Sequence, residues 1–80
     1  MNIKKIIADD GKYYEMEVPG FTKSNLNIQF ENNIFSVSGK RRDICDKVVE
    51  VNYNINIDEG SQVVATIHDG ILILQSRFKR

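Results

Sequence analysis

The sequence predicts an all-β fold in which roughly six or seven short strands, joined by tight turns, pack as an antiparallel β-sandwich. Residues 49–57 alternate strictly between apolar and polar side chains, which is the period of a half-buried strand. Turn-forming pairs, among them Asp-Gly and Asn-Asn, separate the apolar stretches. No stretch has the apolar spacing of a helix over several turns, so the sequence predicts no long helix.

The alternating stretch 48–57 is the strand around which the other predicted strands are arranged. At ~3.4 Å per residue it would span roughly 30 Å, which is long for a strand of a small domain. One face would carry the apolar side chains of Val49, Val51, Tyr53, Ile55 and Ile57. Between these apolar residues, one glutamate and three asparagines would lie on the opposite face, so we expect one face to be buried and the other to be in water.

Two strands are predicted before the first long turn. Residues 3–8 combine β-branched side chains with lysines, which suits an exposed edge strand. Asp9-Asp10-Gly11-Lys12 predicts a tight turn in which Asp-Gly takes positive φ. A second strand over residues 13–18 ends at Pro19-Gly20, because proline lacks the donor that a central ladder needs. Residues 22–25 then predict a polar corner of one helical turn.

The middle of the chain predicts a hairpin. Residues 26–30 alternate between apolar and polar side chains, and residues 34–38 place Phe35 and Val37 inward and Ser36 and Ser38 outward. The two stretches flank Asn32-Asn33. Asparagine tolerates the left-handed backbone region that a tight hairpin requires. We expect Gly39 to end the regular strand and residues 40–46 to form a charged connection to the long strand.

The last third of the chain predicts a second hairpin. Residues 58–61 close the long strand, and residues 63–67 form a further strand with Val63, Ala65 and Ile67 on one face. Asp69-Gly70 turns the chain into residues 71–74, which are apolar on both faces. Continuous apolar runs are typical of strands that are covered on both sides. The chain from Gln75 onward reads as a polar tail.

Composition limits the classes of function. Eighty residues predict a single domain, 1–80, and 41% hydrophobic with 28% charged residues is ordinary globular composition, neither disordered nor membrane-spanning. Basic and acidic residues cancel at 11 each, whereas nucleic-acid-binding modules usually carry a basic excess. The basic clusters at 40–42 and 77–80 suit solvated turns and a chain end. The alternative, DNA binding through Lys40, Arg41 and Arg42, predicts a strongly salt-dependent affinity.

Catalytic and metal-binding patterns are lacking in the sequence. His68 is the only histidine and lies beside a predicted turn, and Cys45 is the only cysteine, so an intramolecular disulfide is excluded. A Cys45–His68 nucleophile pair would lack a recognisable oxyanion site. We therefore expect no enzyme activity, no cofactor and no metal. A lone cysteine, with no signal-peptide core and no apolar membrane span, favours the cytoplasm.

Two segments resemble the α-crystallin domain of small heat-shock proteins. The first begins at Val18-Pro19-Gly20-Phe21 and continues through Asn33-Ile34-Phe35-Ser36-Val37-Ser38-Gly39. The second is Ala65-Thr66-Ile67-His68-Asp69-Gly70-Ile71-Leu72, which is similar to the family's A-x-x-x-N-G-V-L signature. Both occur in this order with the long strand between them, so the resemblance covers nearly the whole chain. It implies an immunoglobulin-like antiparallel β-sandwich of about seven strands.

The sequence departs from the family pattern in its terminal segments and at Tyr53, and these differences predict how the protein assembles. The family's variable N-terminal arm and its C-terminal Ile-x-Ile extension are not in the sequence, which suggests a minimal form and no large assemblies. The resemblance to the animal type implies a homodimer in which two copies of strand 47–57 pair antiparallel. The dimer-strand residues would be Val49, Val51, Tyr53 and Ile55. Because the family often has an arginine at the position of Tyr53, a dimer salt bridge built on it would be absent.

The resemblance implies an ATP-independent chaperone that binds partly unfolded client proteins and prevents their aggregation. In the family, a groove between strands corresponding to 26–30 and 63–68 receives an Ile-x-Ile segment or a client. The matching residues here are Ile28, Phe30, Val64 and Thr66. Ile28 and Phe30 also fit a purely structural role in the core. The alternative function is a non-catalytic adaptor of the CS-domain type, because the same fold serves that role.

Overall fold

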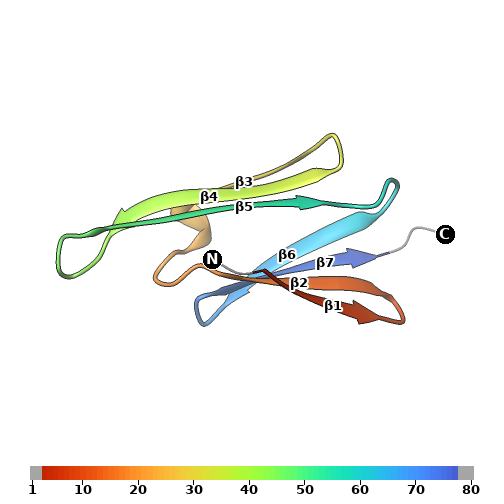
Figure 1. The fold of residues 1–80 in the computed structure, drawn as a ribbon, viewed down its shortest axis with the longest axis horizontal. Helices are drawn as coiled ribbons and strands as arrows, with labels where there is room; N and C mark the ends of the chain where they lie inside the picture. The colour runs from red at the N-terminus through yellow and green to blue at the C-terminus, as the bar shows by residue number, and fades with distance from the viewer. Residues whose placement is uncertain (1–2, 78–80) are drawn as a thin grey trace.

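The computed structural model describes residues 3–77, which form seven strands in two antiparallel sheets packed face to face (Figure 1). One sheet has four strands in the order β1-β2-β7-β6, and the other has three in the order β3-β4-β5. The strands are β1 (Ile3–Ala8), β2 (Gly11–Glu17), β3 (Leu26–Glu31), β4 (Ile34–Arg42), β5 (Val48–Asn56), β6 (Gln62–His68) and β7 (Ile71–Arg77). The predicted antiparallel β-sandwich is confirmed.

The core lies between the two sheets and is built from alternate residues of the central strands. Met16 of β2, Val37 of β4, and Leu72 and Leu74 of β7 have no measurable exposure. In β5 every second residue from Val51 is buried, so the period-two prediction for the long strand is confirmed. Apolar burial of this kind is the main favourable term that holds two sheets together.

Local turn chemistry explains the hairpins. Asn32 and Asn33 both have positive φ between β3 and β4, and Asp69 and Gly70 do so between β6 and β7. Positive φ at both central residues matches the twist of antiparallel strands. The first hairpin differs from the prediction, because Asp9 and Asp10 form its turn and Gly11 already pairs with Ala8 in the ladder. The predicted helical turn is present as the 3-10 helix η1 (Lys23–Asn25), where the Thr22 N–H donates to Asn25 Oδ1 at 2.7 Å.

Strand β4 continues past Gly39 to Arg42, so the prediction that Gly39 ends the strand was wrong. Gly39 lies on the inner face, where a Cβ would come within 2.8 Å of Leu26 Cδ2 and 2.9 Å of the Phe21 ring. The glycine therefore makes room for core side chains within a continuous strand. Lys40, Arg41 and Arg42 belong to the ladder with β5 and are not part of a loop.

The connection between β4 and β5 is correspondingly short. The Asp43 carboxylate accepts hydrogen bonds from the N–H groups of Cys45 and Lys47 at 2.8 and 2.9 Å. The Asp43 N–H also donates to the Lys47 carbonyl at 2.9 Å, and Asp46 adopts a φ of 60°. These bonds close the turn tightly, which allows β4 and β5 to form a long, regular hairpin.

Strand β7 is covered on one face only, unlike the prediction from its apolar run. Leu72, Leu74 and Ser76 are buried in the core, whereas Ile71 and Ile73 are half-exposed on the outer face. The strand also continues past residue 74 to Arg77, so residues 75–77, which were predicted as tail, belong to β7. Most of the basic cluster at 77–80 lies outside the described residues.

Candidate functional site: the open strand edges and the outer apolar patch

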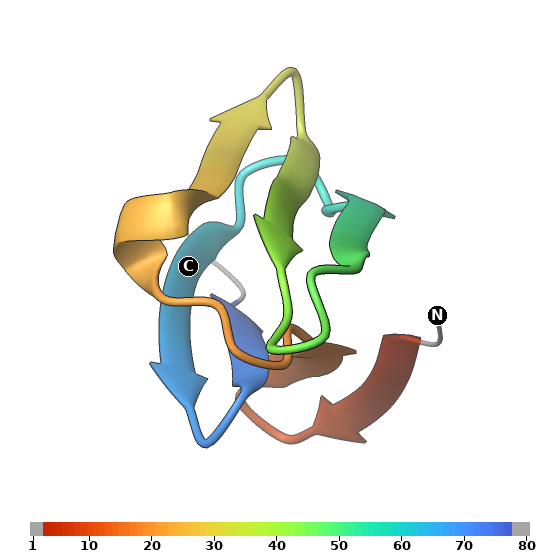
Figure 2. The same cartoon turned by 90° about the vertical axis from the view of Figure 1, so that its left-hand side faces the viewer.

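Four strand edges of the sandwich are open within residues 3–77. Strands β3 and β6 are the last strands of their sheets on one side, and β5 and β1 are the last strands on the other side (Figure 2). An edge strand presents backbone N–H and C=O groups that can pair with another chain. The apolar side chains next to these edges determine which side chains of a pairing chain would find favourable contacts.

The side formed by β3 and β6 carries a row of half-buried apolar side chains, which we call the β3–β6 strip. Phe30, at the end of the row, is 43% exposed, and it pairs in the ladder with the buried Phe35. The other members pack against the core while keeping part of their surface accessible: Leu26, Ile28, Val63, Ala65 and Ile67. The strip therefore places accessible apolar surface beside two open edges.

The structure separates the four predicted groove residues into two pairs. Ile28 and Phe30 lie on the inner face of β3 and belong to the β3–β6 strip. Val64 and Thr66 are exposed and alternate with the core-facing Ala65, so they lie on the outer face of β6. The prediction that all four line one groove is therefore corrected. Period two allows only alternate residues of a strand on one face, and Val63, Ala65 and Ile67 occupy the inner one.

Val64 and Thr66 belong instead to an apolar patch on the outer face of the four-stranded sheet. The ladder aligns Val64 with Gln75, Tyr13 and Ile6, and it aligns Thr66 with Ile73. Val64 is 53% exposed and Ile6 is 39% exposed. We call Ile6, Tyr13, Val64, Thr66 and Ile73 the outer patch. Sequence reasoning missed its extent, although the apolar run 71–74 was a signal that β7 has an apolar outer face.

The predicted dimer-strand side chains point into the protein. Val51, Tyr53 and Ile55 are buried in the core, and Val49 packs against it. The Tyr53 hydroxyl donates to the Glu17 carbonyl at 2.7 Å, which links β5 to β2 across the core. Burial raises the pKa of Tyr53 above its usual value. At this edge only the backbone of β5 and its polar outer face are open to a partner.

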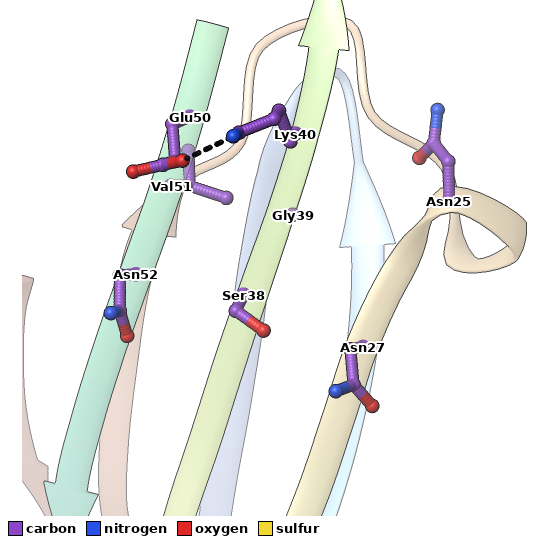
Figure 3. A pocket seen from close by; sticks show the side chains of 8 residues that line it. All are labelled: Asn25, Asn27, Ser38, Gly39, Lys40, Glu50, Val51 and Asn52. Atoms are coloured by element: carbon purple, nitrogen blue, oxygen red, sulfur yellow. Dashed lines mark ion pairs between the residues drawn. The ribbon is translucent and has the colours of Figure 1, made fainter.

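The outer face of the three-stranded sheet is polar. The ladder aligns Asn27 with Ser38 and Asn52, and Ser36 Oγ donates to Asn54 Oδ1 at 3.0 Å. A shallow hollow of about 380 Å³ lies on this face, beside the Lys40–Glu50 ion pair at 3.5 Å. Figure 3 shows the side chains that line it. Its lining residues are Asn25, Asn27, Ser38, Gly39, Lys40, Glu50, Val51 and Asn52. This surface offers amide and hydroxyl groups for hydrogen bonds, and the exposed apolar side chains of Ile34 and Val48 lie at the first residues of β4 and β5.

The basic residues of β4 have partners within the chain. Arg41 Nε donates to the Pro19 carbonyl at 2.8 Å, and its guanidinium lies 5.3 Å from the centre of the Phe21 ring. Arg42 Nη1 donates to the Asp46 carbonyl at 3.0 Å. Lys40 Nζ lies 3.5 Å from Glu50 Oε2, so each of the three basic residues has a contact within the chain.

The remaining reactive side chains are dispersed. His68 Nε2 lies 3.2 Å from Asp69 Oδ2 on the surface, and Cys45 is an exposed thiol in the β4–β5 turn. Among residues 3–77, no three His, Cys, Asp or Glu side chains are grouped as a metal site requires. Within the same residues, no helix has the length and apolar character of a membrane span.

Solved structures with low sequence identity have the same fold. A small heat-shock protein from Xylella fastidiosa superposes with a TM-score of 0.84 at 11% identity, covering 99% of this chain and 85% of that one. The hspA protein from Xanthomonas axonopodis gives 0.78 at 12% identity, covering 98% of this chain and 92% of that one. At these identities the likeness establishes the fold.

Sequence comparisons establish the family. The 18 kDa heat shock protein of Clostridium acetobutylicum is 32% identical over 84 residues, 84% of this chain and 55% of that protein. Small heat shock protein C4 of Rickettsia felis is 28% identical over 87 residues, 88% of this chain and 52% of that protein. The chain thus spans about half the length of these curated relatives. The model of the Hsp20/alpha crystallin family matches residues 5–78, and the chain belongs to that family.

Proposed function

We propose that this protein is an ATP-independent holdase, which binds partly unfolded client proteins and keeps them from aggregating. The observation that carries the proposal is the accessible apolar surface beside open strand edges, in the β3–β6 strip and the outer patch. A folded monomer normally keeps such surface small, because it favours association. Family membership supports a chaperone role in general.

Binding would combine backbone pairing with apolar contact. An extended client segment can add to the free edge of β3 or β6 through main-chain hydrogen bonds, which are independent of sequence. Its alternate side chains would then meet the apolar members of the strip, such as Ile28 and Phe30, or the outer-face side chains of Val64 and Thr66. This mode needs no nucleotide, metal or catalytic group, and it suits clients with no common sequence.

The free edge of β5 would hold two copies together as a homodimer, through the strand predicted for this role. Its inward side chains already belong to the core, so pairing would add backbone hydrogen bonds without unpacking the monomer. We place this dimer in the cytoplasm, where Cys45 would remain a thiol.

A non-catalytic adaptor is the second candidate, and the polar hollow of Figure 3 favours it. Amide and hydroxyl groups on a regular sheet face suit a native partner with a fixed hydrogen-bond pattern better than a mixture of unfolded chains. The two functions therefore assign the binding surface to different faces: the apolar β3–β6 strip and outer patch for the holdase, and the polar outer face of the three-stranded sheet for the adaptor. Replacements on each face distinguish them.

The test is suppression of heat- or reductant-induced aggregation of a model client, followed by light scattering without ATP. The holdase proposal expects suppression at a near-equimolar ratio. Val64→Asp and Phe30→Asp should each weaken it several-fold, because a carboxylate in the contact opposes apolar association. Gln62→Asp and Gln29→Asp are matched controls, since they add the same charge on the same strands at exposed polar positions.

The outcomes separate the candidates. Equal loss in the variants and in their controls would show that charge alone matters and would remove the proposed contact surfaces. If the unmodified protein gives no suppression, the holdase function is contradicted. Capture of one native partner, lost on Asn52→Asp but not on Val64→Asp, would then support the adaptor.

A further inference from the structure

Two adjoining hollows lie where β2 ends and β7 begins, at one end of the four-stranded sheet. Glu17 of β2 and Ile71 of β7 line both hollows, and the ladder pairs these two residues directly. The hollow beside Pro19 and the β6–β7 turn has a volume of about 460 Å³, and the hollow beside β1 has a volume of about 340 Å³. The Val18 N–H donates to the Gly70 carbonyl at 2.8 Å, which holds the turn against the end of β2. The walls are thus part of the hydrogen-bonded fold.

Carboxylates dominate the charged residues that line the two hollows. Glu15, Glu17 and Asp69 carry three negative charges and Lys4 carries one positive charge, which leaves a net charge of −2. The chain as a whole is neutral, with 11 basic and 11 acidic residues, so this charge is local. Asp69 lies 3.2 Å from His68, whereas neither glutamate forms an ion pair within residues 3–77. We call the two hollows together the acidic hollow.

The acidic hollow continues the outer patch. Ile71 and Ile73 alternate with the core-facing Leu72, so they lie on the same outer face of β7. The ladder pairs Glu15 with Ile73, which belongs to the outer patch, and Glu17 with Ile71. Both isoleucines are half-exposed, so apolar surface extends from the patch into the hollow. An extended segment that lies along β7 would therefore meet apolar side chains over the patch and carboxylates at its end.

We propose that the acidic hollow makes the outer patch selective for unfolded segments in which an arginine or lysine follows apolar side chains on the same face of the extended chain. The proposal rests on the holdase function proposed above and specifies which client segments that function takes. Such a segment has side chains on one face every roughly 7 Å, which is the spacing of Ile73 and Ile71 along their strand. An acidic side chain at the same position would be repelled.

A basic side chain suits the acidic hollow in both of its parts. Its aliphatic stem would pack on Ile71 and Pro19, while its charged head meets Glu15 and Glu17. The two glutamates are two residues apart on one strand, so their Cα atoms lie roughly 7 Å apart and one cation can lie between both carboxylates. Glu15 is half-buried, which reduces the screening of such a contact by the solvent.

The other two candidate binding surfaces lack this excess of carboxylates. The polar hollow of the three-stranded sheet contains one charge of each sign, Lys40 and Glu50, and these lie 3.5 Å apart. The members of the β3–β6 strip are all apolar. A preference for basic segments therefore distinguishes binding at the acidic hollow from binding at either of these surfaces.

Peptide binding, measured by fluorescence anisotropy, tests the selectivity. The probe is a labelled peptide with blocked ends, in which serine alternates first with three valines and then with two arginines. Its counterparts carry glutamine or glutamate in place of both arginines. At low salt the arginine peptide should bind about 3- to 10-fold more tightly than the glutamine peptide, because ion pairs with the glutamates are gained. The glutamate peptide should bind most weakly, and all differences should shrink at high salt.

Substitutions that keep the size of the side chain locate the effect. Glu15→Gln and Glu17→Gln should each lower the preference for the arginine peptide by about 2- to 3-fold, since each removes one carboxylate. Lys4→Gln should raise the preference, because it removes the one positive charge of the lining. Glu59→Gln is the matched control, because it changes the net charge equally in the exposed turn before β6 and should leave the preference unchanged. Circular dichroism confirms that each variant is folded.

The outcomes separate this proposal from the holdase function. If the protein suppresses client aggregation but binds the three peptides equally, or binds none of them, the selectivity is overturned and the function stands. An equal loss of preference in Glu17→Gln and Glu59→Gln would assign the effect to net charge and would also overturn the proposal. If aggregation is not suppressed, the holdase function is contradicted, and with it the assignment of the basic segments to clients.

Discussion

The two sheets share one core, yet their outer faces differ in character. The four-stranded sheet carries the outer patch with Val64 and Ile73, whereas the three-stranded sheet carries a row of amides and hydroxyls. Their inner faces are built alike, from alternating residues that are buried at the same interface. Stability therefore depends on the inner faces, and any difference in what the two sheets bind must arise from the outer faces and the edges.

The largest expected effect comes from comparing the free energy of unfolding when an inner residue of the four-stranded sheet is replaced with that when an outer residue is replaced. Leu72→Ala should lower the free energy of unfolding by about 2–5 kcal/mol, because it leaves a cavity at a fully buried site. Val64→Thr keeps the β-branched shape at an exposed site and should change it by less than about 0.5 kcal/mol. Urea denaturation measures both, and similar losses would mean that the outer patch also supports the fold.

The three-stranded sheet has its own test at Gly39. An alanine Cβ would approach Leu26 and the Phe21 ring too closely, so Gly39→Ala should cost about 1–3 kcal/mol through overpacking. Thermal unfolding should show a lowered midpoint. Ser38→Ala, on the outer face of the same strand, is the control and should be nearly neutral. If Gly39→Ala raised the midpoint, this part of the inner face would have spare room.

Tyr53 joins the two sheets by a hydrogen bond. Tyr53→Phe should cost about 1–3 kcal/mol, since it leaves the Glu17 carbonyl without this donor. The pH dependence has a definite sign, because burial raises the pKa of Tyr53 above its ordinary 10.0 and the neutral phenol is the form favoured by folding. Its contribution is complete below about pH 10 and is lost as the pH rises through the folded pKa.

Denaturant titrations between neutral and alkaline pH measure this effect. The difference in stability between the unmodified protein and Tyr53→Phe should shrink above about pH 10. A difference that is constant across this range would mean that the hydroxyl ionises equally in both states and that its burial has no energetic consequence.

The smallest expected effect lies at the rim between the sheets. Lys12 Nζ bonds Asp58 Oδ2 at 2.8 Å, which lowers the pKa of Asp58 below its ordinary 3.8 and raises that of Lys12. The depressed pKa of Asp58 gives a contribution that is present above about pH 4 and is lost as the pH falls through the folded value. Asp58→Asn should lower the melting midpoint slightly at pH 7 and low salt, and the difference should shrink at high salt. A midpoint shift that persists at pH 2 would contradict the ion pair as its cause.

Sequence patterns were sufficient for the fold because its elements are local. Alternation over residues 49–57 and the turn pairs Asn32-Asn33 and Asp69-Gly70 specify strands and hairpins within a few residues of themselves. The family resemblance was likewise carried by short segments, and the family model confirms it. The strand end at Gly39 was misjudged, because a glycine that breaks a strand and a glycine that admits a neighbouring ring are identical in sequence.

The candidate site depended on information that no single segment contains. Alternation shows that Val64 and Ala65 face opposite sides of a strand, but it does not show that Val64 shares one row of the sheet with Tyr13 and Ile6, which lie two and three strands away. Pairing order and register create that patch, and they result from the packing of the whole sandwich.

The sequence by itself determined the strands, the tight turns and the inward face of β5, because each depends on side-chain alternation or on backbone preferences over a few residues. Only the tertiary structure decided which edges remain open, that β4 runs on to Arg42, and that the predicted groove residues divide between two surfaces. Those features depend on which strands become neighbours, and contacts between distant segments are settled only when the two sheets close over a shared core.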